Sequence, residues 1–269
     1  DISLFFILIK EVICDNDEFF YNIVLSFVAQ ILQDPFNKLG TCLIINGAKR
    51  IGKGSFIKLI IKLIGSAHSM QTTKSDQVFG RFNGHIMHKL LIYMNEAFWS
   101  GDKSTESDIK GLITDDDTSY EIKNGPTFEG KNYSRLILDS NSSHMIPATF
   151  DEGRYIALKA SECKKGDLDF FKIVNDFRDS NKVMEKIMHF FKNFDYKPYE
   201  KHLREAPKSK FLGEQIKENF DLYQEWWYRN LTHGNIYNAT YNQDGQGIRI
   251  ANEELWNSFC EYHGQVKTK

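Results

Sequence analysis

The sequence predicts an α/β protein with a mostly parallel sheet, preceded by an N-terminal helical unit and followed by a small C-terminal domain. Short apolar runs at residues 42–45, 89–94, 135–138 and 154–158 alternate with helical stretches, as in parallel sheets whose strands are joined by helices. A glycine-rich loop at residues 47–55 follows the first run and leads into an apolar helical pattern. The runs indicate the sheet, and the loop indicates where a ligand would bind at its edge.

Composition limits the size of the core and the kind of surface. With 269 residues, 41% of them hydrophobic, the chain can bury a sizeable core in one large or two unequal domains. Its formal net charge of -2 argues against a broad basic surface. Any contact with nucleic acid would therefore depend on a few local lysines and arginines.

The cysteines and the apolar segments indicate a soluble intracellular protein. The four cysteines are widely separated and form no CxxC pair, so we expect reduced thiols. The apolar run at residues 5–9 is too short to span a bilayer, and no membrane partner is expected. Because the chain begins at Asp1 and not at Met, it is interpreted as a piece of a longer polypeptide.

The first domain expected, residues 1–38, is a helical unit. Asp17 is placed to cap a helix whose apolar residues, from Phe19 to Ile31, are spaced for one face. Pro35 would stop that helix.

The second domain expected, residues 39–195, holds the parallel sheet. Residues 118–131 read as a β-hairpin, with the turn signal Asn-Gly-Pro at 124–126 and lysines near its tip. Helical stretches at residues 169–177 and 183–194 would close this domain.

The third region, residues 196–269, is expected to be a linker and a small accessory domain. The polar segment 195–210 contains two prolines and is the linker candidate. An aromatic-rich helix is expected over residues 211–231, followed by a short helix around residues 253–262.

The glycine-rich loop has the GxxxxGK spacing of a phosphate-binding loop, so we expect it to bind ATP. Its glycines let backbone N–H groups wrap the phosphates, and Lys53 would reach the β and γ phosphates. Gly54 stands where a Ser or Thr usually ligates Mg²⁺, so Ser55, one place later, becomes a candidate metal ligand. The expected nucleotide-binding residues of the loop are Gly47, Ala48, Lys49, Arg50, Ile51, Gly52, Lys53, Gly54 and Ser55.

Polar residues after the later strands complete a predicted ATPase site. Asn95 and Glu96 follow the second run, where Mg²⁺ and the attacking water are expected; Glu96 is the predicted general base and both are candidate metal ligands. Asn141, after the third run, would position the water. Arg154 is placed in chain order to act as an arginine finger on the phosphate of a neighbouring subunit.

Several ordered motifs resemble a known family. They are Asn-Glu-Ala-Phe-Trp at 95–99, Lys-Gly-Leu-Ile-Thr at 110–114, the hairpin with Lys123, the strand into Asn141, and Asp-Glu-x-Arg at 151–154. Together they resemble the superfamily 3 helicases of viruses and mobile elements, in particular the primase-helicase branch, over roughly residues 15–195.

The resemblance implies an AAA+ type ATPase core that uses ATP and Mg²⁺, assembles as a hexameric ring and translocates on single-stranded DNA. It also implies fusion to an N-terminal primase. The hypothesis is a replicative DNA helicase motor whose DNA contacts are Lys110, Lys123 and Lys131. One departure is Gly153, where the family commonly has a second arginine beside Arg154.

Other readings remain open. Gly54 and Asn95 leave few metal ligands, which is compatible with a non-enzymatic, nucleotide-bound oligomerising or DNA-docking module. A monomeric nucleoside kinase shares the loop but would not need the Asn141 and Arg154 elements. Arg154 is equally compatible with a structural ion pair to a neighbouring acid, and the three lysines with ordinary solvated charges.

Overall fold

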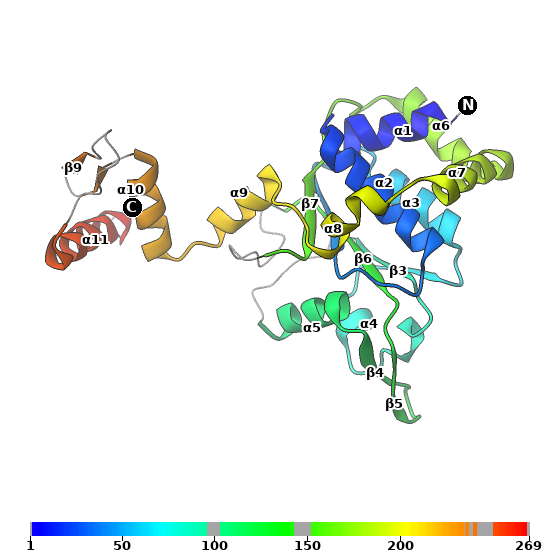
Figure 1. The fold of residues 1–269 in the computed structure, drawn as a ribbon, viewed down its shortest axis with the longest axis horizontal. Helices are drawn as coiled ribbons and strands as arrows, with labels where there is room; N and C mark the ends of the chain where they lie inside the picture. The colour runs from blue at the N-terminus through cyan, green and yellow to red at the C-terminus, as the bar shows by residue number, and fades with distance from the viewer. Residues whose placement is uncertain are drawn as a thin grey trace. The chain divides into compact units, whose positions relative to one another are not determined.

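The chain forms two compact units, Asp1–Gln215 and Ile216–Lys269. The structure is a computed structural model, and it describes residues 2–95, 103–142, 152–233, 235–236, 239–240 and 250–267 (Figure 1).

A five-stranded parallel sheet lies at the centre of the first unit. Its spatial order is β2 (Ser69–Thr72), β3 (Leu91–Asn95), β6 (Arg135–Ser140), β1 (Cys42–Asn46) and β7 (Tyr155–Lys159). Every neighbouring pair is parallel, which confirms the predicted α/β class with a mainly parallel sheet. Four strands fall on the four predicted apolar runs. Strand β2 was not predicted, because its sequence Ser-Met-Gln-Thr has no apolar run.

Helices cover one face of this sheet, and most of the core lies between them and the strands (Figure 1). Sheet residues such as Leu43, Ile137 and Ile156 pack there against buried side chains of the helices. The covering elements are α1 (Ser3–Ile7), the π-helix η1 (Leu8–Ile13), α2 (Glu18–Gln33), α3 (Lys53–Ile64), α6 (Leu168–Asp179) and α7 (Asn181–Asn193).

Apart from β3, the elements between β2 and β6 in the chain lie away from that helical layer (Figure 1). They are α4 (Asp76–Phe79), the 3-10 helix η2 (Gly84–Ile86), α5 (Lys103–Thr114) and the hairpin of β4 (Asp117–Glu121) with β5 (Thr127–Lys131). The antiparallel pairing of β4 with β5 confirms the predicted hairpin. Asn124 in its turn has φ 60, a left-handed conformation that asparagine tolerates.

Helix ends in this unit follow the local sequence signals. Asp17 lies outside α2 and its carboxylate accepts a hydrogen bond from the Phe20 amide at 3.0 Å, as a capping residue should. Asp167 caps α6 in the same way, accepting from the Phe170 amide at 3.0 Å. The predicted helix over residues 19–31 is therefore confirmed, with its end before Pro35.

The domain boundaries differ from those expected. Residues 195–210, expected as a linker, contain η3 (Lys197–Tyr199) and α8 (Glu200–Arg204), and they bury Tyr196 and Leu203 in the main core. Thr41 also donates a hydrogen bond to the carbonyl of Leu203 at 2.9 Å. The N-terminal helices share the same core, so the first compact unit runs from residue 1 to 215.

The second unit contains α10 (Leu222–His233), β8 (Asn235–Ile236), β9 (Ala239–Thr240) and α11 (Asn252–Lys267). The single helix predicted over 211–231 is wrong: α9 (Lys210–Glu218) ends, and three residues separate it from the start of α10. The break has a local cause, because Asp221 and Gln224 hydrogen-bond each other's backbone amides at 2.8 and 3.1 Å, a capping box that starts a new helix. No helix among the described residues is both long and apolar enough to cross a bilayer.

Lys38 connects the segment before β1 to the end of α5, and it should make stability depend on pH. Its Nζ donates to the carbonyls of Leu112 and Asp115, at 3.2 and 2.6 Å. Burial, helped by the charge of Arg135, lowers the pKa of Lys38 to about 8 against the opposing effect of Asp116 and Asp115.

Between pH 8 and 10.5 the unfolded chain therefore keeps a proton on Lys38 that the folded chain has released. Because the unfolded state binds more protons there, the free energy of unfolding should rise with pH across this window. Urea unfolding of the wild type and of Lys38→Met at several pH values isolates the effect of this residue. A difference between the two that stays constant with pH would contradict the expectation.

Candidate functional site

The glycine-rich loop joins β1 to α3 at the carboxyl edge of the sheet. Gly47 and Gly52 have φ values of 153 and 106, and Arg50 has a φ of 63. A Cβ atom at Gly52 would lie 2.6 Å from Cε1 of Phe171 and 3.1 Å from Cδ1 of Leu8. The loop therefore needs glycine at position 52, both for its backbone conformation and for the close approach of α6 and η1.

Lys53, the first residue of α3, turns its side chain back into the loop. The residue is buried, and its ammonium donates hydrogen bonds to the carbonyls of Gly47 and Ala48, the latter at 3.1 Å. The N-terminus of α3 begins at the same point, and the first amides of a helix have no acceptor within the helix. A cation and a helix N-terminus thus meet at one place, an arrangement that favours an anionic ligand.

A cavity of about 340 Å³ lies above this loop. Among its described lining residues are four cationic side chains, Lys49, Arg50, Lys53 and Lys58, and a single carboxylate, Asp139. This charge balance suits a polyanion. The other lining residues are Ala48, Ile51, Gly52, Gly54, Ser55, Gln71, Tyr93, Asn95, Ser140 and Asn141.

The strands bring most of the predicted site residues together. Asn95 at the end of β3 lies opposite Asp139 of β6, and Ser140 lies opposite Asn46 at the end of β1. Asn95 and Asn141 line the cavity with the loop, as predicted from their positions after the strands. Glu96, the predicted general base and metal ligand, lies outside the described residues.

Sequence reasoning missed a buried polar pair in the cavity wall. The Tyr93 hydroxyl donates a hydrogen bond to Oδ1 of Asp139 at 3.0 Å, and both residues are buried. Asp139 was not among the predicted site residues. The sequence does carry a signal for Asp139. Residues two apart in a strand point to the same face of the sheet, so Asp139 shares the helix-covered face with Arg135 and Ile137. Gln71 also lines the cavity and was missed because β2 was not predicted.

Ser55, the predicted substitute metal ligand, lines the cavity but already has a partner. Its hydroxyl donates to Oδ1 of Asn175 on α6 at 3.3 Å. Gly54 has open space around its Cβ position: apart from the backbone of its own helix, no atom of the described residues lies within 4 Å. A hydroxyl at position 54 would therefore fit next to the cavity without steric conflict.

Arg154 lies at the opposite edge of the sheet from the loop. Its carbonyl accepts a hydrogen bond from the amide of Cys42, at the start of β1, at 2.8 Å. The loop follows Asn46, at the end of the same strand, about 13 Å away at ~3.3 Å per residue. Arg154 also forms the ion pair that sequence reasoning left open, with Nη1 3.3 Å from Oε1 of Glu152.

The three lysines predicted to contact DNA lie away from the loop cavity, on α5 and the hairpin. Lys110 pairs with Glu106 at 2.5 Å, and Lys131 with Asp117 at 2.8 Å. Lys123 is exposed in the hairpin turn, and none of the ion pairs found between described residues includes it.

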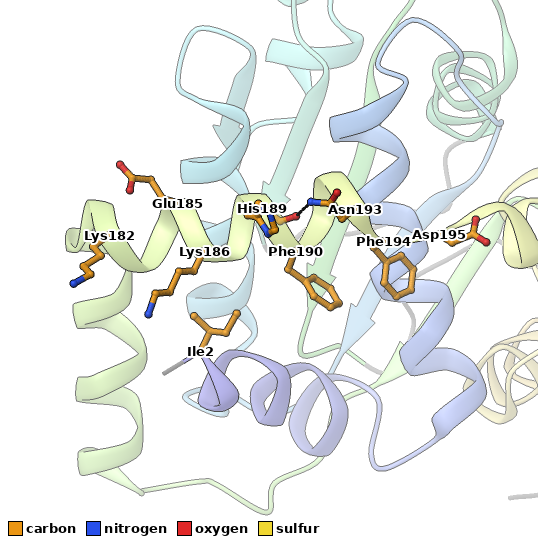
Figure 2. Close-up of a pocket in the computed structure, with 9 residues that line it drawn as sticks. All are labelled: Ile2, Lys182, Glu185, Lys186, His189, Phe190, Asn193, Phe194 and Asp195. Atoms are coloured by element: carbon orange, nitrogen blue, oxygen red, sulfur yellow. Dashed lines mark hydrogen bonds between the residues drawn. The ribbon is translucent and has the colours of Figure 1, made fainter.

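A larger cavity of about 960 Å³ lies between the start of α1 and helix α7 (Figure 2). Its wall carries Phe190 and Phe194, and Figure 2 shows Lys186 on the same side of α7 as Ile2 and Phe190. Its two lysines are balanced by two acids, and no glycine-rich loop borders it. The smaller cavity therefore carries the chemistry expected for a phosphate ligand.

Comparison with known proteins finds similarity to a family model and to one phage protein. Residues 45–154, about two fifths of the chain, match a family described only as a family of unknown function, DUF5906. A protein named DNA primase-polymerase, from Nitratiruptor phage NrS-1, is 24% identical over 144 residues, which is 52% of this chain and 19% of that protein.

Solved structures share the fold. The apo structure of the NrS-1 C-terminal region superposes with a TM-score of 0.73 at 18% identity, covering 87% of this chain and 55% of that one. A second apo crystal form gives a TM-score of 0.71 over 87% of this chain and 54% of that one. The chain thus spans about half of that solved region and has its mixed α/β fold.

Proposed function

We propose that this chain is the ATP-hydrolysing motor of a DNA helicase and part of a larger primase-helicase. The observation that carries the proposal is the cavity over the glycine-rich loop, where four cationic side chains and a helix N-terminus surround space for a polyanion. The similarity to a phage protein named DNA primase-polymerase supports a role in DNA replication. The motif order supports the superfamily 3 assignment within an AAA+ type core.

In this proposal Lys53 and the loop amides hold the β and γ phosphates of ATP. The Lys53 ammonium would exchange its hydrogen bonds to the Gly47 and Ala48 carbonyls for charge-assisted bonds to phosphate oxygens. Because the side chain is already folded into the loop, little further ordering is required.

The donor set beside the loop fits Mg²⁺. This ion is commonly held by one or two carboxylates together with substrate phosphates and waters. Asp139 and Asn95, neighbours across β6 and β3, would supply a carboxylate and an amide oxygen, with Glu96 following directly in the sequence. When bound, Mg²⁺ would offset charge on the phosphates. Glu96 would accept the proton of the attacking water, and Asn141 would orient that water.

The distance between Arg154 and its own loop supports action in trans. An arginine side chain at the amino edge of the sheet cannot reach a phosphate at the carboxyl edge of the same chain. Arg154 would therefore stabilise charge on ATP bound to a neighbouring copy, which requires assembly as a ring, proposed here as a homo-hexamer.

DNA contact is proposed at the hairpin turn. Lys123 is exposed there, next to Ile122, and Phe82 is exposed on the neighbouring segment. That segment is attached to the hairpin, because Arg81 contacts both carboxylate oxygens of Glu121 at 2.8 and 3.0 Å. A cation beside exposed apolar and aromatic side chains suits the backbone and bases of single-stranded DNA.

The proposal is tested by strand displacement and ATP turnover. The assembled full-length protein should unwind a DNA duplex in the presence of ATP and Mg²⁺, and Glu96→Gln should bind ATP without hydrolysing it. Absence of unwinding by an assembled, ATP-binding protein would reject the helicase activity.

A matched pair of substitutions at Gly54 tests the missing metal ligand. Gly54→Ala and Gly54→Ser should both be accommodated, since no described residue outside α3's own backbone lies within 4 Å of the new Cβ, and each should stabilise α3 by about 0.5–1 kcal/mol. Only Gly54→Ser should lower the Mg²⁺ concentration needed for half-maximal ATP turnover, because only serine adds a metal ligand. Identical Mg²⁺ dependence for the two variants would show that water or another residue already fills that position.

A second candidate function is a nucleotide-bound oligomerising or DNA-docking module. It is favoured by the absence of a hydroxyl at Gly54 and by the engagement of Ser55 with Asn175. Under this alternative, the wild type would hydrolyse ATP with Mg²⁺ no faster than the variants Lys53→Ala and Glu96→Gln.

A further inference from the structure

Glu152 makes two hydrogen-bonding contacts with Arg154 through one oxygen. Its Oε1 accepts from the Arg154 backbone amide at 2.9 Å and from Arg154 Nη1 at 3.3 Å. The Glu152 side chain is 1% exposed, whereas the Arg154 side chain is 38% exposed. The buried carboxylate of Glu152 thus holds one side of the Arg154 guanidinium, and the rest of the Arg154 side chain is partly exposed to solvent.

The backbone around this pair is fixed on both sides. The Arg154 carbonyl accepts from the Cys42 amide at 2.8 Å, and the Gly153 carbonyl accepts from the Ala206 amide at 2.7 Å. Glu152 lies close enough to the buried hydroxyl of Tyr155 that its charge adds to burial in raising the pKa of that tyrosine. With the backbone held, the contact to Glu152 determines where the Arg154 guanidinium lies.

The pairing of the two side chains is incomplete. Oε2 of Glu152 and Nε of Arg154 are both buried and have no hydrogen-bond partner among the described residues. A guanidinium has five N–H donors, and the contact to Glu152 uses one of them. The remaining donors include those at the exposed edge, where an external anion has access.

We propose that Glu152 is a positioning residue, which holds the Arg154 guanidinium in the orientation that meets a phosphate bound to a neighbouring copy. This inference rests on the proposed function. The carboxylate would orient the guanidinium before the neighbour arrives, which lowers the ordering cost of the contact.

Kinetics of the full chain test the effect on the reaction. Glu152→Ala should lower kcat for ATP on the order of 100-fold with little change in KM, because a copy with this substitution keeps an intact loop. Glu152→Gln keeps the shape of the side chain and one acceptor oxygen, so its kcat should fall less than that of Glu152→Ala. Glu205→Gln is the control, since Glu205 is an exposed acid lining the same neighbouring cavity as Glu152. A wild-type kcat in Glu152→Ala would overturn the proposal.

Mixing two defective variants separates positioning from general damage. A Lys53→Ala copy lacks a working loop but can offer a correctly held Arg154 to a neighbour with Glu152→Ala. Mixed assemblies should therefore regain turnover that neither variant shows alone. Turnover no higher than that of the separate variants would overturn the claim that Glu152 acts through Arg154 across the interface.

A direct measurement keeps the inference independent of the proposed ATPase. The ¹⁵Nη1–¹Hη1 resonance of Arg154, the donor to Glu152, is assigned by its loss in Arg154→Lys and should show slow solvent exchange in the wild type and fast exchange in Glu152→Ala. If the wild type hydrolyses no ATP but this change is seen, the proposed function fails and the positioning contact stands. An unchanged resonance in Glu152→Ala would overturn the positioning role.

Discussion

Replacing Lys53 by alanine should reduce ATP turnover by about 100- to 1,000-fold, as the loss of a single preorganised charge at a reacting centre commonly does. The residue is buried, and its ammonium lies within the loop that would surround the phosphates. Alanine leaves the backbone amides and the helix N-terminus but removes the cation that would lie nearest the β and γ phosphates in the proposed complex. Steady-state phosphate release measures the effect.

The control for this prediction is Lys58→Ala. Lys58 lines the same cavity and also carries a positive charge, but it is exposed. It should weaken ATP binding only modestly, because an exposed charge is screened by solvent. Equal losses in the two variants would indicate a general electrostatic attraction for anions and not a specific contact of Lys53 with the phosphates.

Replacing Arg135 by leucine should destabilise the first unit by about 3 kcal/mol or more, because five acceptors around a buried guanidinium lose their donor at once. The buried guanidinium donates to the carbonyls of Pro35, Tyr133, Asp34 and Asn37 and to the side chain of Gln30. These groups lie mainly at the end of α2 and in the turn that follows it. Denaturant unfolding measures the change.

Arg178→Leu is the matched control for that prediction. Arg178 pairs with the adjacent Asp179 at 3.3 Å, and both side chains are exposed, so its loss should change stability by less than about 0.5 kcal/mol. A similarly small effect for Arg135→Leu would mean that water replaces the guanidinium at the end of α2. Arg135→Lys should cost less stability than Arg135→Leu but more than Arg178→Leu. A single ammonium cannot reach all the acceptors that surround the planar guanidinium.

Much of the fold was predictable because local patterns and tertiary needs agree. Strands β1, β3, β6 and β7 are buried, and burial in a parallel sheet selects continuous apolar runs. Helix α2 has both an amphipathic pattern and a capping aspartate. In these elements the local sequence signals were enough, because no tertiary contact opposed them.

Other elements were missed where the local signal is weak or ambiguous. Strand β2 is polar and lies at the edge of the sheet, so apolar periodicity could not reveal it. The segment 195–210 is mostly polar and contains prolines, yet Tyr196 and Leu203 attach it to the main core. Two buried side chains among many polar ones do not produce a periodic pattern.

The sequence by itself determined the α/β class and which candidate site residues the chain contains, namely the GxxxxGK loop and the polar residues after each strand. These depend on short-range spacing and on the rule that parallel strands end at one edge of a sheet. Only the tertiary structure decided which groups meet. It placed Asp139 and Tyr93 in the cavity wall, directed Ser55 toward Asn175, and put Arg154 beside Glu152 at the far edge of the sheet. Strand order and register set these contacts, and they arise from pairings between segments far apart in the chain.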